Sequence, residues 1–236
     1  LAVAQAILDC CNDFSQLPRQ SIIRMQELGR QYPDCGFGGM FRKWVFSDNP
    51  SPYNSFGNGA AMRVSACGFA ASSIENAKLL AKSVTEVTHN HSEGIKGAEA
   101  VATCIYLARK EKNLSEIRGY VNKHYYPLDF TLNAIRDSYS FNVTCQGSVP
   151  QAITAFLEST SFEDAIRNAI SIGGDSDTLA AIAGGIAAAY YGVPAHIREH
   201  ALTFLDQNLR RILIDFESAY PPTQGNIHKP TCPILE

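Results

Sequence analysis

The stretch Gly173-Gly174-Asp175-Ser176-Asp177-Thr178, followed by the Ala-, Gly- and Ile-rich segment 179–191, decides how the rest of the chain is interpreted. Two carboxylates and a hydroxyl lie within four residues, behind a glycine pair that lets the backbone turn sharply. An oxygen-only ligand set without Cys or His suits a hard divalent cation such as Mg²⁺, Mn²⁺ or Ca²⁺. The alternative is that the acidic groups only cap a helix that opens at Thr178. The motif alone does not decide between metal binding and capping.

Two other aspartate-rich motifs do not fit this stretch. An EF-hand loop would need an acid or amide at position 179, a glycine at 180 and a glutamate at 186, where Leu179, Ala180 and Ile186 stand. A phosphatase-type aspartyl nucleophile would follow an apolar strand. The preceding segment 161–172 instead has a capping signature and apolar residues at helical spacing. Both motifs are therefore excluded.

The remaining segments are expected to be helical as well. Apolar residues recur at intervals of three and four, and no stretch shows the sustained alternation of a β-strand. The exception is 32–62, which is rich in Gly, Pro, Asn and Ser and is expected to be a long functional loop. The sequence predicts an all-α protein with helices at 1–8, 21–29, 72–87, 93–109, 113 onward, 129–137, 148–158, 161–172, 179–191, 194–205 and 206–218.

Length and composition indicate one globular domain over 1–220, followed by an irregular tail over 221–236. The 236 residues carry a net charge of −3, which argues against a nucleic-acid or anionic-membrane partner. The most apolar stretch, 178–191, is too short to span a bilayer. The 7 cysteines show no metal or disulfide spacing, so free thiols in a reducing, cytoplasmic compartment are expected.

Two further segments place polar groups on loops beside helices. The run Ser55-Phe56-Gly57-Asn58-Gly59-Ala60-Ala61-Met62-Arg63 offers backbone N–H groups at Gly-flanked positions, which could cradle a phosphate or form a plain turn. His89 and His91 lie two residues apart at a helix end. They could act as general acid or base, contact a ribose, or serve as a C-cap. They lack the partners of a zinc site.

Four motifs in this order carry a resemblance to a known family. They are the run 55–63, then Thr88-His89-Asn90-His91 with Ile95-Lys96-Gly97-Ala98, then Cys145-Gln146-Gly147-Ser148-Val149-Pro150, and then Gly173-Gly174-Asp175-Ser176-Asp177-Thr178. Over roughly residues 1–217 the chain resembles the ADP-ribosylglycohydrolase family, which includes the dinitrogenase reductase-activating glycohydrolases and the lens J1-crystallins. The resemblance implies a compact, all-α, multi-helix orthogonal bundle with a site for two Mg²⁺ or Mn²⁺ ions between helices.

The resemblance also implies an activity and assigns roles to residues. The activity is metal-dependent hydrolysis of the glycosidic bond between ADP-ribose and a modified side chain or small acceptor. The expected partners are therefore ADP-ribose and ADP-ribosylated proteins. Asp175 and Asp177 are the expected catalytic residues, and together with Thr178 they are the expected metal ligands. The residues expected along the substrate are Ser55, Phe56 and Gly57 at the diphosphate, Asn58 and Gly59 in the same loop, and His89 at the ribose.

One departure from the family pattern concerns the N-terminus. Family members carry a Gly-Asp-x-x-Gly stretch and a Thr-Asp-Asp-Thr run there, which supply the other half of the metal ligands. This sequence contains neither, and it starts like the middle of an apolar helix. We therefore expect that a preceding segment is missing and that this chain alone binds metal weakly and is inactive. Two alternatives stay open: a non-catalytic, crystallin-like or ADP-ribose-binding relative, and an unrelated helical protein in which Asp175 and Asp177 only cap.

Overall fold

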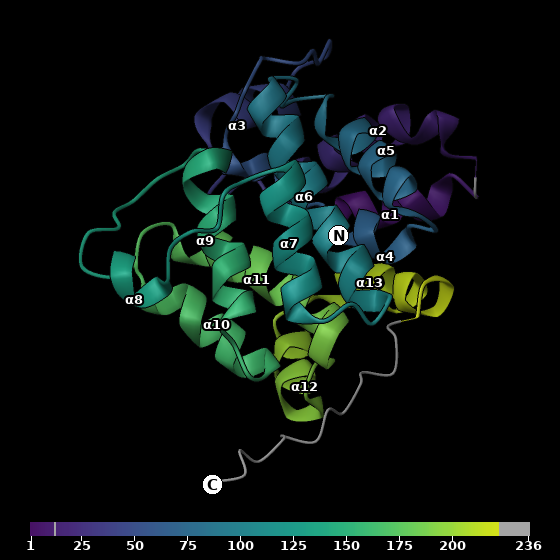
Figure 1. Ribbon diagram of the computed structural model, residues 1–236. Helices are drawn as coiled ribbons and strands as arrows, with labels where there is room; N and C mark the ends of the chain where they lie inside the picture. Colours follow the sequence, from purple (N-terminus) through teal and green to yellow (C-terminus); the bar gives the residue numbers. More distant parts are fainter. Residues whose placement is uncertain (12, 222–236) are drawn as a thin grey trace, which may run out of the picture.

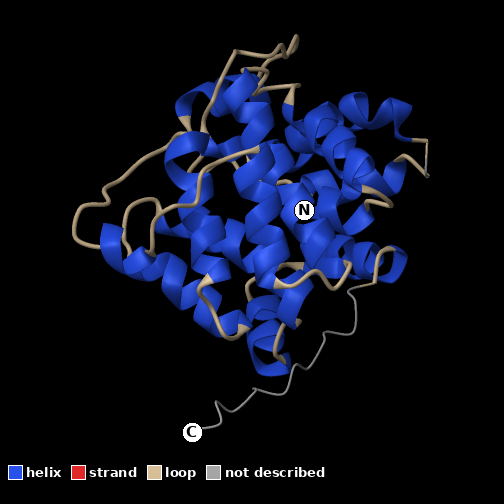
Figure 2. Cartoon of the chain, viewed as in Figure 1, coloured by secondary structure: helices blue, strands red, loops and turns tan. Residues whose placement is uncertain are grey.

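The computed structural model describes residues 1–11 and 13–221, and this part of the chain is built from helices joined by loops (Figure 2). Within these residues there is no β-strand, only an isolated antiparallel bridge between Gly57 and Thr144. The all-α prediction is confirmed. The elements in chain order are α1 (Ala2–Asp9), η1 (Phe14–Gln16), α2 (Leu17–Gln31), α3 (Gly39–Val45), η2 (Asn58–Ala60), α4 (Ser65–Ala70), α5 (Ile74–Thr85), α6 (Ser92–Arg109), α7 (Leu114–His124), α8 (Leu132–Ile135), α9 (Cys145–Leu157), α10 (Phe162–Ser171), α11 (Ser176–Tyr191), α12 (Ala195–Thr203) and α13 (Gln207–Ala219), where η marks a 3₁₀ helix.

Several helices begin where the sequence signals a cap. At α7, the Asn113 side chain accepts from the Glu116 N–H and the Glu116 carboxylate accepts from the Asn113 N–H, both at 2.9 Å. This reciprocal pair is a capping box. At α10, Ser161 Oγ accepts from the Asp164 N–H at 3.1 Å. The helices predicted at 72–87, 93–109, 161–172, 194–205 and 206–218 are confirmed to within two residues at each end.

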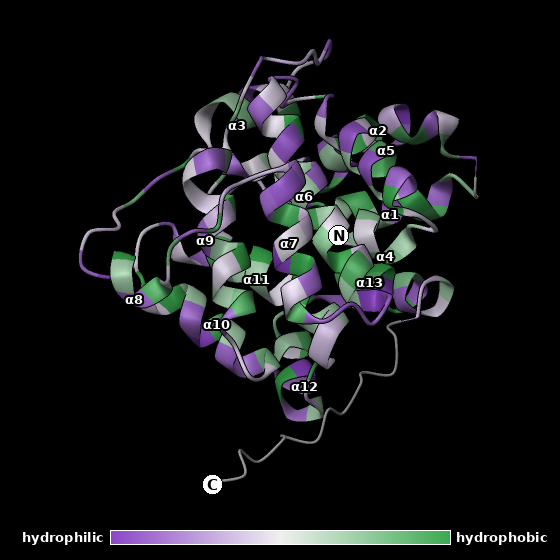
Figure 3. Ribbon diagram, viewed as in Figure 1, coloured by the Kyte–Doolittle hydropathy of each residue, from purple (hydrophilic) through white to green (hydrophobic). Residues whose placement is uncertain are grey.

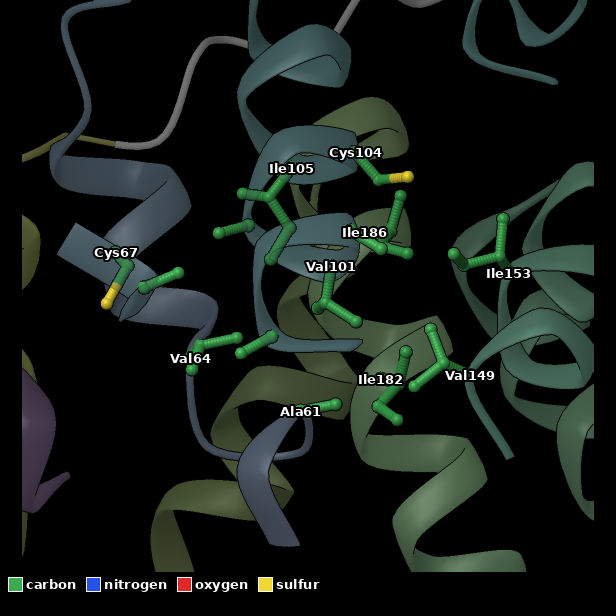
Figure 4. Packing of buried hydrophobic residues seen from close by; sticks show 14 of the residues in the cluster. Ala61, Val64, Cys67, Val101, Cys104, Ile105, Val149, Ile153, Ile182 and Ile186 are labelled. Carbon is green, nitrogen blue, oxygen red and sulfur yellow. The ribbon is translucent and has the colours of Figure 1, made fainter. Parts of the chain in front are cut away.

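Helix α11 lies among α4, α6, α9 and α10 near the middle of the bundle (Figure 1). Eight of its sixteen residues are buried, and most of the others are half-buried. In Figure 4, Ile182 and Ile186 of α11 lie between Val101 of α6 and Val149 of α9. Small residues permit this close packing, because bulkier side chains would hold the helix axes further apart. Helix α11 is therefore buried on most of its sides.

The core is one large cluster of buried apolar side chains. It draws on residues from Val3 in α1 to Phe216 in α13, and therefore on nearly the whole described chain. Figure 3 shows apolar residues gathered on the inner helices and polar ones along the outer faces. A small second cluster under α3 holds Met25, Trp44, Val45 and Val87. None of the described helices combines the length and the apolar character needed to cross a bilayer.

Four local predictions are wrong in extent. Helix α2 runs from Leu17, well before the predicted start at 21, because Pro18 is tolerated in a first turn. The segment 32–62 is not an uninterrupted loop, since it contains α3 and η2. The helix predicted at 129–137 shrinks to the single turn α8. Helix α9 starts at Cys145, capped by Thr144, so Pro150 lies inside the helix and not in its first turn.

The helix that follows the acidic stretch begins earlier in the sequence than predicted. Helix α11 begins at Ser176, which makes Asp175 the N-cap residue and puts Thr178 in the first turn. Gly173 and Gly174 precede it with φ of +73° and +70°, a left-handed conformation that favours glycine. The irregular tail expected over 221–236 lies, from residue 222 onward, outside the described residues.

Candidate active site

The N-terminus of α11 meets two segments that are distant in sequence. One is the loop 54–57 with η2, and the other is the loop that leads into α9. These two loops are joined by backbone hydrogen bonds from Asn58 N–H to Val143 O at 2.7 Å and from Cys145 N–H to Phe56 O at 2.9 Å. The pairing fixes the Gly-rich loop against the loop that leads into α9.

Asn58 connects the Gly-rich loop to the acidic loop directly. Its Nδ2 donates to Asp175 Oδ2 at 2.6 Å. The same nitrogen lies 3.0 Å from Ser148 Oγ and 3.3 Å from the Asn142 carbonyl oxygen. Because Asn58 is buried, this network fixes the direction in which its amide points and, through it, the orientation of the Asp175 carboxylate.

Asp175 occupies the N-cap position without capping the helix by its side chain. Its carboxylate turns instead toward Asn58, Asp177 and Thr178. Burial first, and then the neighbouring Asp177 carboxyl, raise the pKa of Asp175, while the hydrogen bond from Asn58 lowers it. The alternative in which both aspartates only cap the helix is therefore wrong for Asp175. Asp177 accepts from the N–H of Thr178 at 2.9 Å, a bond within the first turn.

The three predicted metal ligands are close together. Thr178 is buried, and its hydroxyl donates to Met62 Sδ at 3.5 Å, which is a weak acceptor. Two carboxylates and a hydroxyl form the oxygen-only donor set that Mg²⁺ and Mn²⁺ prefer. Residues 1–11 and 13–221 contain no group of three or more His, Cys, Asp or Glu side chains arranged to hold a metal. The described residues thus fit part of a coordination sphere, not a complete one.

His89 is buried on the other side of the Gly-rich loop, in the segment that follows the end of α5 at Thr85. A Cβ atom added to Gly57 would lie 3.6 Å from His89 Nε2, and one added to Gly59 would lie 3.5 Å from it. The imidazole therefore faces the loop closely, and glycine keeps the space between them free. Burial and then the charge of Arg63 lower the pKa of His89 to about 3. The low pKa keeps the ring neutral at physiological pH, so that only one of its two nitrogens carries a hydrogen.

The remaining predicted residues divide between the inside and the rim of the site. Ser55 is buried, and its Oγ accepts from the Gly57 N–H at 3.1 Å. Phe56 is exposed at 43%, and its ring lies 5.2 Å from the ring of His91. His91 is the N-cap of α6, accepting from the Glu93 N–H at 3.1 Å. The C-cap suggested by the sequence is wrong for His91, because α5 has already ended at Thr85.

Several residues of the site were not predicted from the sequence. Ser148 lies in one of the four motifs, but only the structure shows its hydroxyl beside Asn58. The sequence does not point to Asn142, because Asn142 contributes its backbone carbonyl oxygen, which accepts from Asn58 and Ser148. Tyr139 packs against Gly174, where a Cβ atom would lie 2.5 Å from its ring. Arg63 stands at the end of the Gly-rich motif and approaches His89.

A comparison of the whole chain with known protein families agrees with the arrangement of these motifs around α11. The sequence model of ADP-ribosylglycohydrolases matches residues 1–222. This chain belongs to the ADP-ribosylglycohydrolase family. Among solved structures, an ADP-ribosylglycohydrolase-related protein complex has the same fold, with a TM-score of 0.66 and 20% identity over 92% of this chain and 78% of that chain.

Curated relatives in the ADP-ribosylglycohydrolase family include ADP-ribosylhydrolase ARH3 from Bos taurus and from Homo sapiens. Each is 28% identical to this chain over the matched region. That region covers 68% of this chain, 60% of the Bos taurus protein and 61% of the Homo sapiens protein. ADP-ribosylarginine hydrolase Tri1 from Pseudomonas putida is 30% identical over 48% of this chain and 32% of its own length. The chain thus spans about three fifths of the ARH3 proteins that it matches.

Proposed function

We propose that this protein hydrolyses the glycosidic bond between ADP-ribose and a modified side chain or small acceptor, with Mg²⁺ or Mn²⁺ as cofactor. The observation that carries this proposal is the 2.6 Å hydrogen bond from Asn58 to Asp175. It joins a Gly-rich loop suited to a diphosphate with a cluster of oxygen ligands suited to a cation. The relatives ADP-ribosylhydrolase ARH3 and ADP-ribosylarginine hydrolase Tri1 support the same class of substrate.

The side chains of the chain itself have distinct parts in this proposal. The backbone N–H groups of Ser55, Phe56 and Gly59 would hold the diphosphate, because those of Gly57 and Asn58 already donate to Ser55 Oγ and to the Val143 carbonyl oxygen. The Asn58 side chain orients Asp175. Asp175, Asp177 and Thr178 would hold the cation, which when bound can polarise substrate oxygens and lower the pKa of a water molecule. His89 lies beside the ribose as a neutral hydrogen-bonding group.

The alternative function is binding of ADP-ribose without turnover. In this case the Gly-rich loop would still hold the diphosphate, while the acidic cluster would have no chemical part. The partly buried, unfavourably charged Asp175 argues for catalysis, because a binding or structural protein gains nothing from keeping such a carboxyl.

The decisive measurement is release of ADP-ribose from ADP-ribosylated protein in the presence of Mg²⁺ or Mn²⁺. In a chain that carries its full N-terminus, Asp175→Asn and Asp177→Asn should each lose most of the turnover while staying folded, since removing a charged ligand costs several kcal/mol of transition-state stabilisation. Asp215→Asn, at an exposed position of α13, is the matched control and should keep the parental rate.

Three results would speak against parts of this proposal. Parental turnover in both site variants would remove the metal assignment. Calorimetric binding of ADP-ribose by a chain with no turnover at any metal concentration would favour the binding alternative. Tight binding of two metal ions by this chain would show that residues other than Asp175, Asp177 and Thr178 complete the coordination, since a divalent ion takes about six oxygens.

The Gly-rich loop should act on binding more than on the chemical step. Its backbone donors would hold the diphosphate equally in the ground and transition states. Gly57→Val should weaken the affinity for ADP-ribose in calorimetry, because its side chain would enter the space beside Ser55 Oγ and His89 Nε2. Gly38→Val is the control, since nothing lies within 4 Å of the added Cβ atom. Unchanged affinity in a folded Gly57→Val variant would make this loop a plain turn.

A further inference from the structure

Arg63 approaches His89 without being paired to a carboxylate. None of the seven ion pairs in the described part of the chain includes it. Its Nη2 donates to Thr88 Oγ1 and lies 3.4 Å from His89 Nδ1. The guanidinium also lies over the ring of Phe41, 5.7 Å from its centroid. The side-chain atoms within hydrogen-bond distance of Arg63 are thus those of Thr88 and His89, and the Tyr53 hydroxyl lies near Arg63 and Thr88.

The contact with Thr88 alone would allow either neutral tautomer of His89. Thr88 Oγ1 lies 2.7 Å from His89 Nδ1 and 3.2 Å from the Thr85 carbonyl oxygen. The hydroxyl has a single hydrogen and can give it to only one of these acceptors. If the hydrogen goes to Thr85, Nδ1 must carry its own and donate it to Thr88. If it goes to Nδ1, the imidazole hydrogen sits on Nε2.

Two observations decide between these arrangements. The Thr85 carbonyl oxygen already accepts from the N–H groups of Thr88 at 3.1 Å and His89 at 2.8 Å, so it is satisfied without the Thr88 hydroxyl, which lies further away, at 3.2 Å. A guanidinium only donates, so a hydrogen on Nδ1 would face a second N–H and a positive charge. We infer that Arg63 is a positioning residue that, with Thr88, holds His89 in the tautomer with its hydrogen on Nε2.

This tautomer makes His89 a hydrogen-bond donor toward the Gly-rich loop. Nε2 is the ring atom that faces Gly57 and Gly59. A ligand held along this loop would meet an N–H group there, suited to an acceptor such as a ribose hydroxyl or a phosphate oxygen. The part of the inference that concerns the ligand rests on the proposed function, whereas the tautomer itself does not.

The test is a ¹H–¹⁵N correlation spectrum of the imidazole nitrogens in the ligand-free full chain at neutral pH. The His89 signals are assigned by their absence in His89→Gln. The wild-type spectrum should show a hydrogen on Nε2 and none on Nδ1. Arg63→Met should give a mixture of both tautomers. Thr85→Val is the control and should keep the wild-type pattern, because the Thr85 hydroxyl is buried without a hydrogen-bond partner.

A hydrogen on Nδ1 in the wild type, or an unchanged pattern in folded Arg63→Met, would overturn the inference. If Arg63→Met does not fold, the wild-type spectrum still decides the tautomer, and Arg63→Lys tests whether a cationic donor at this position keeps it. The affinity for ADP-ribose should fall two- to about tenfold in Arg63→Met. The upper end of this range corresponds to the loss of one neutral hydrogen bond. If the wild type binds no ADP-ribose, the proposed function fails while the tautomer assignment stands on the spectrum.

Discussion

The carboxyl group of Asp175 lies partly buried beside Asp177, and both burial and this like charge raise its pKa. An acid whose pKa is raised by folding is more stable in its protonated form. Its contribution to stability is therefore complete below the unfolded pKa of about 3.9 and is lost as the pH rises through the folded pKa. At neutral pH the charged Asp175 thus makes the fold less stable than a neutral group would.

We predict that Asp175→Asn melts at a higher temperature than the wild type at pH 7, because the amide carries no charge that burial and Asp177 would disfavour. The amide keeps an oxygen that can accept from Asn58 and removes the repulsion with Asp177. The difference should shrink as the pH falls through the raised pKa of the Asp175 carboxyl. Differential scanning calorimetry between pH 4 and pH 7 measures it.

Added Mg²⁺ supplies the control for this stability prediction. A cation that binds the folded state stabilises it by mass action, so it should raise the melting temperature of the wild type and leave that of Asp175→Asn nearly unchanged. Equal melting temperatures of the two proteins at pH 7, or a gap that widens on acidification, would contradict the assigned direction of the Asp175 pKa.

Two glycines inside helices, one in α4 and one in α7, affect the stability of the protein in opposite ways. Gly68 lies in α4, where a Cβ atom would come within 2.6 Å of Ile105 Cβ and 2.7 Å of the Ala102 backbone oxygen in α6. Gly119 lies in α7, where nothing lies within 4 Å of an added Cβ atom. The first glycine is required by the approach of two helices, while the second only adds freedom to the unfolded chain.

We predict that Gly68→Ala destabilises the protein by about 1–3 kcal/mol, because the methyl group has no room and a backbone atom must move. Gly119→Ala should instead stabilise it by about 0.5–1 kcal/mol through helix propensity. Urea denaturation of both variants and the wild type gives the two values. Equal effects of the two substitutions would mean that α4 and α6 are not in contact at Gly68.

The whole molecule folds around a single main core that takes side chains from α1 to α13. The second cluster, with Met25, Trp44, Val45 and Val87, is small and joins α3 to α2, which also packs against α1 and α5. A cluster of four residues cannot offset the chain entropy of folding by itself. The prediction of one domain over 1–220 stays a prediction, which unfolding experiments can test.

We predict that the chain unfolds in one cooperative transition. Trp44 is the only tryptophan and belongs to the second cluster, so its fluorescence reports on that region, whereas far-ultraviolet circular dichroism reports on all helices. The two signals should give the same midpoint in urea. A fluorescence midpoint clearly below that of the helices would show that the region around α3 unfolds separately.

The helical class, the cap at Ser161, the capping box at Asn113 and most helix ranges could be predicted from the sequence, because hydrophobic spacing and caps act within a few residues. The errors arose where local signals compete. Pro150 looked like the start of a helix, but Thr144 caps α9 earlier and packing holds the proline inside it. The apolar α3 was hidden among glycines and prolines that suggested a loop.

The sequence by itself determined the chemical types at the site, namely the oxygen-bearing side chains at 175–178, the glycines at 57 and 59, and the histidine at 89. Tertiary structure decided what those groups do, because burial and charge depend on segments far apart in the chain. Only the fold turns the Asp175 carboxylate away from its own helix toward Asn58, and only the fold brings Arg63 and Thr88 together at one ring nitrogen of His89.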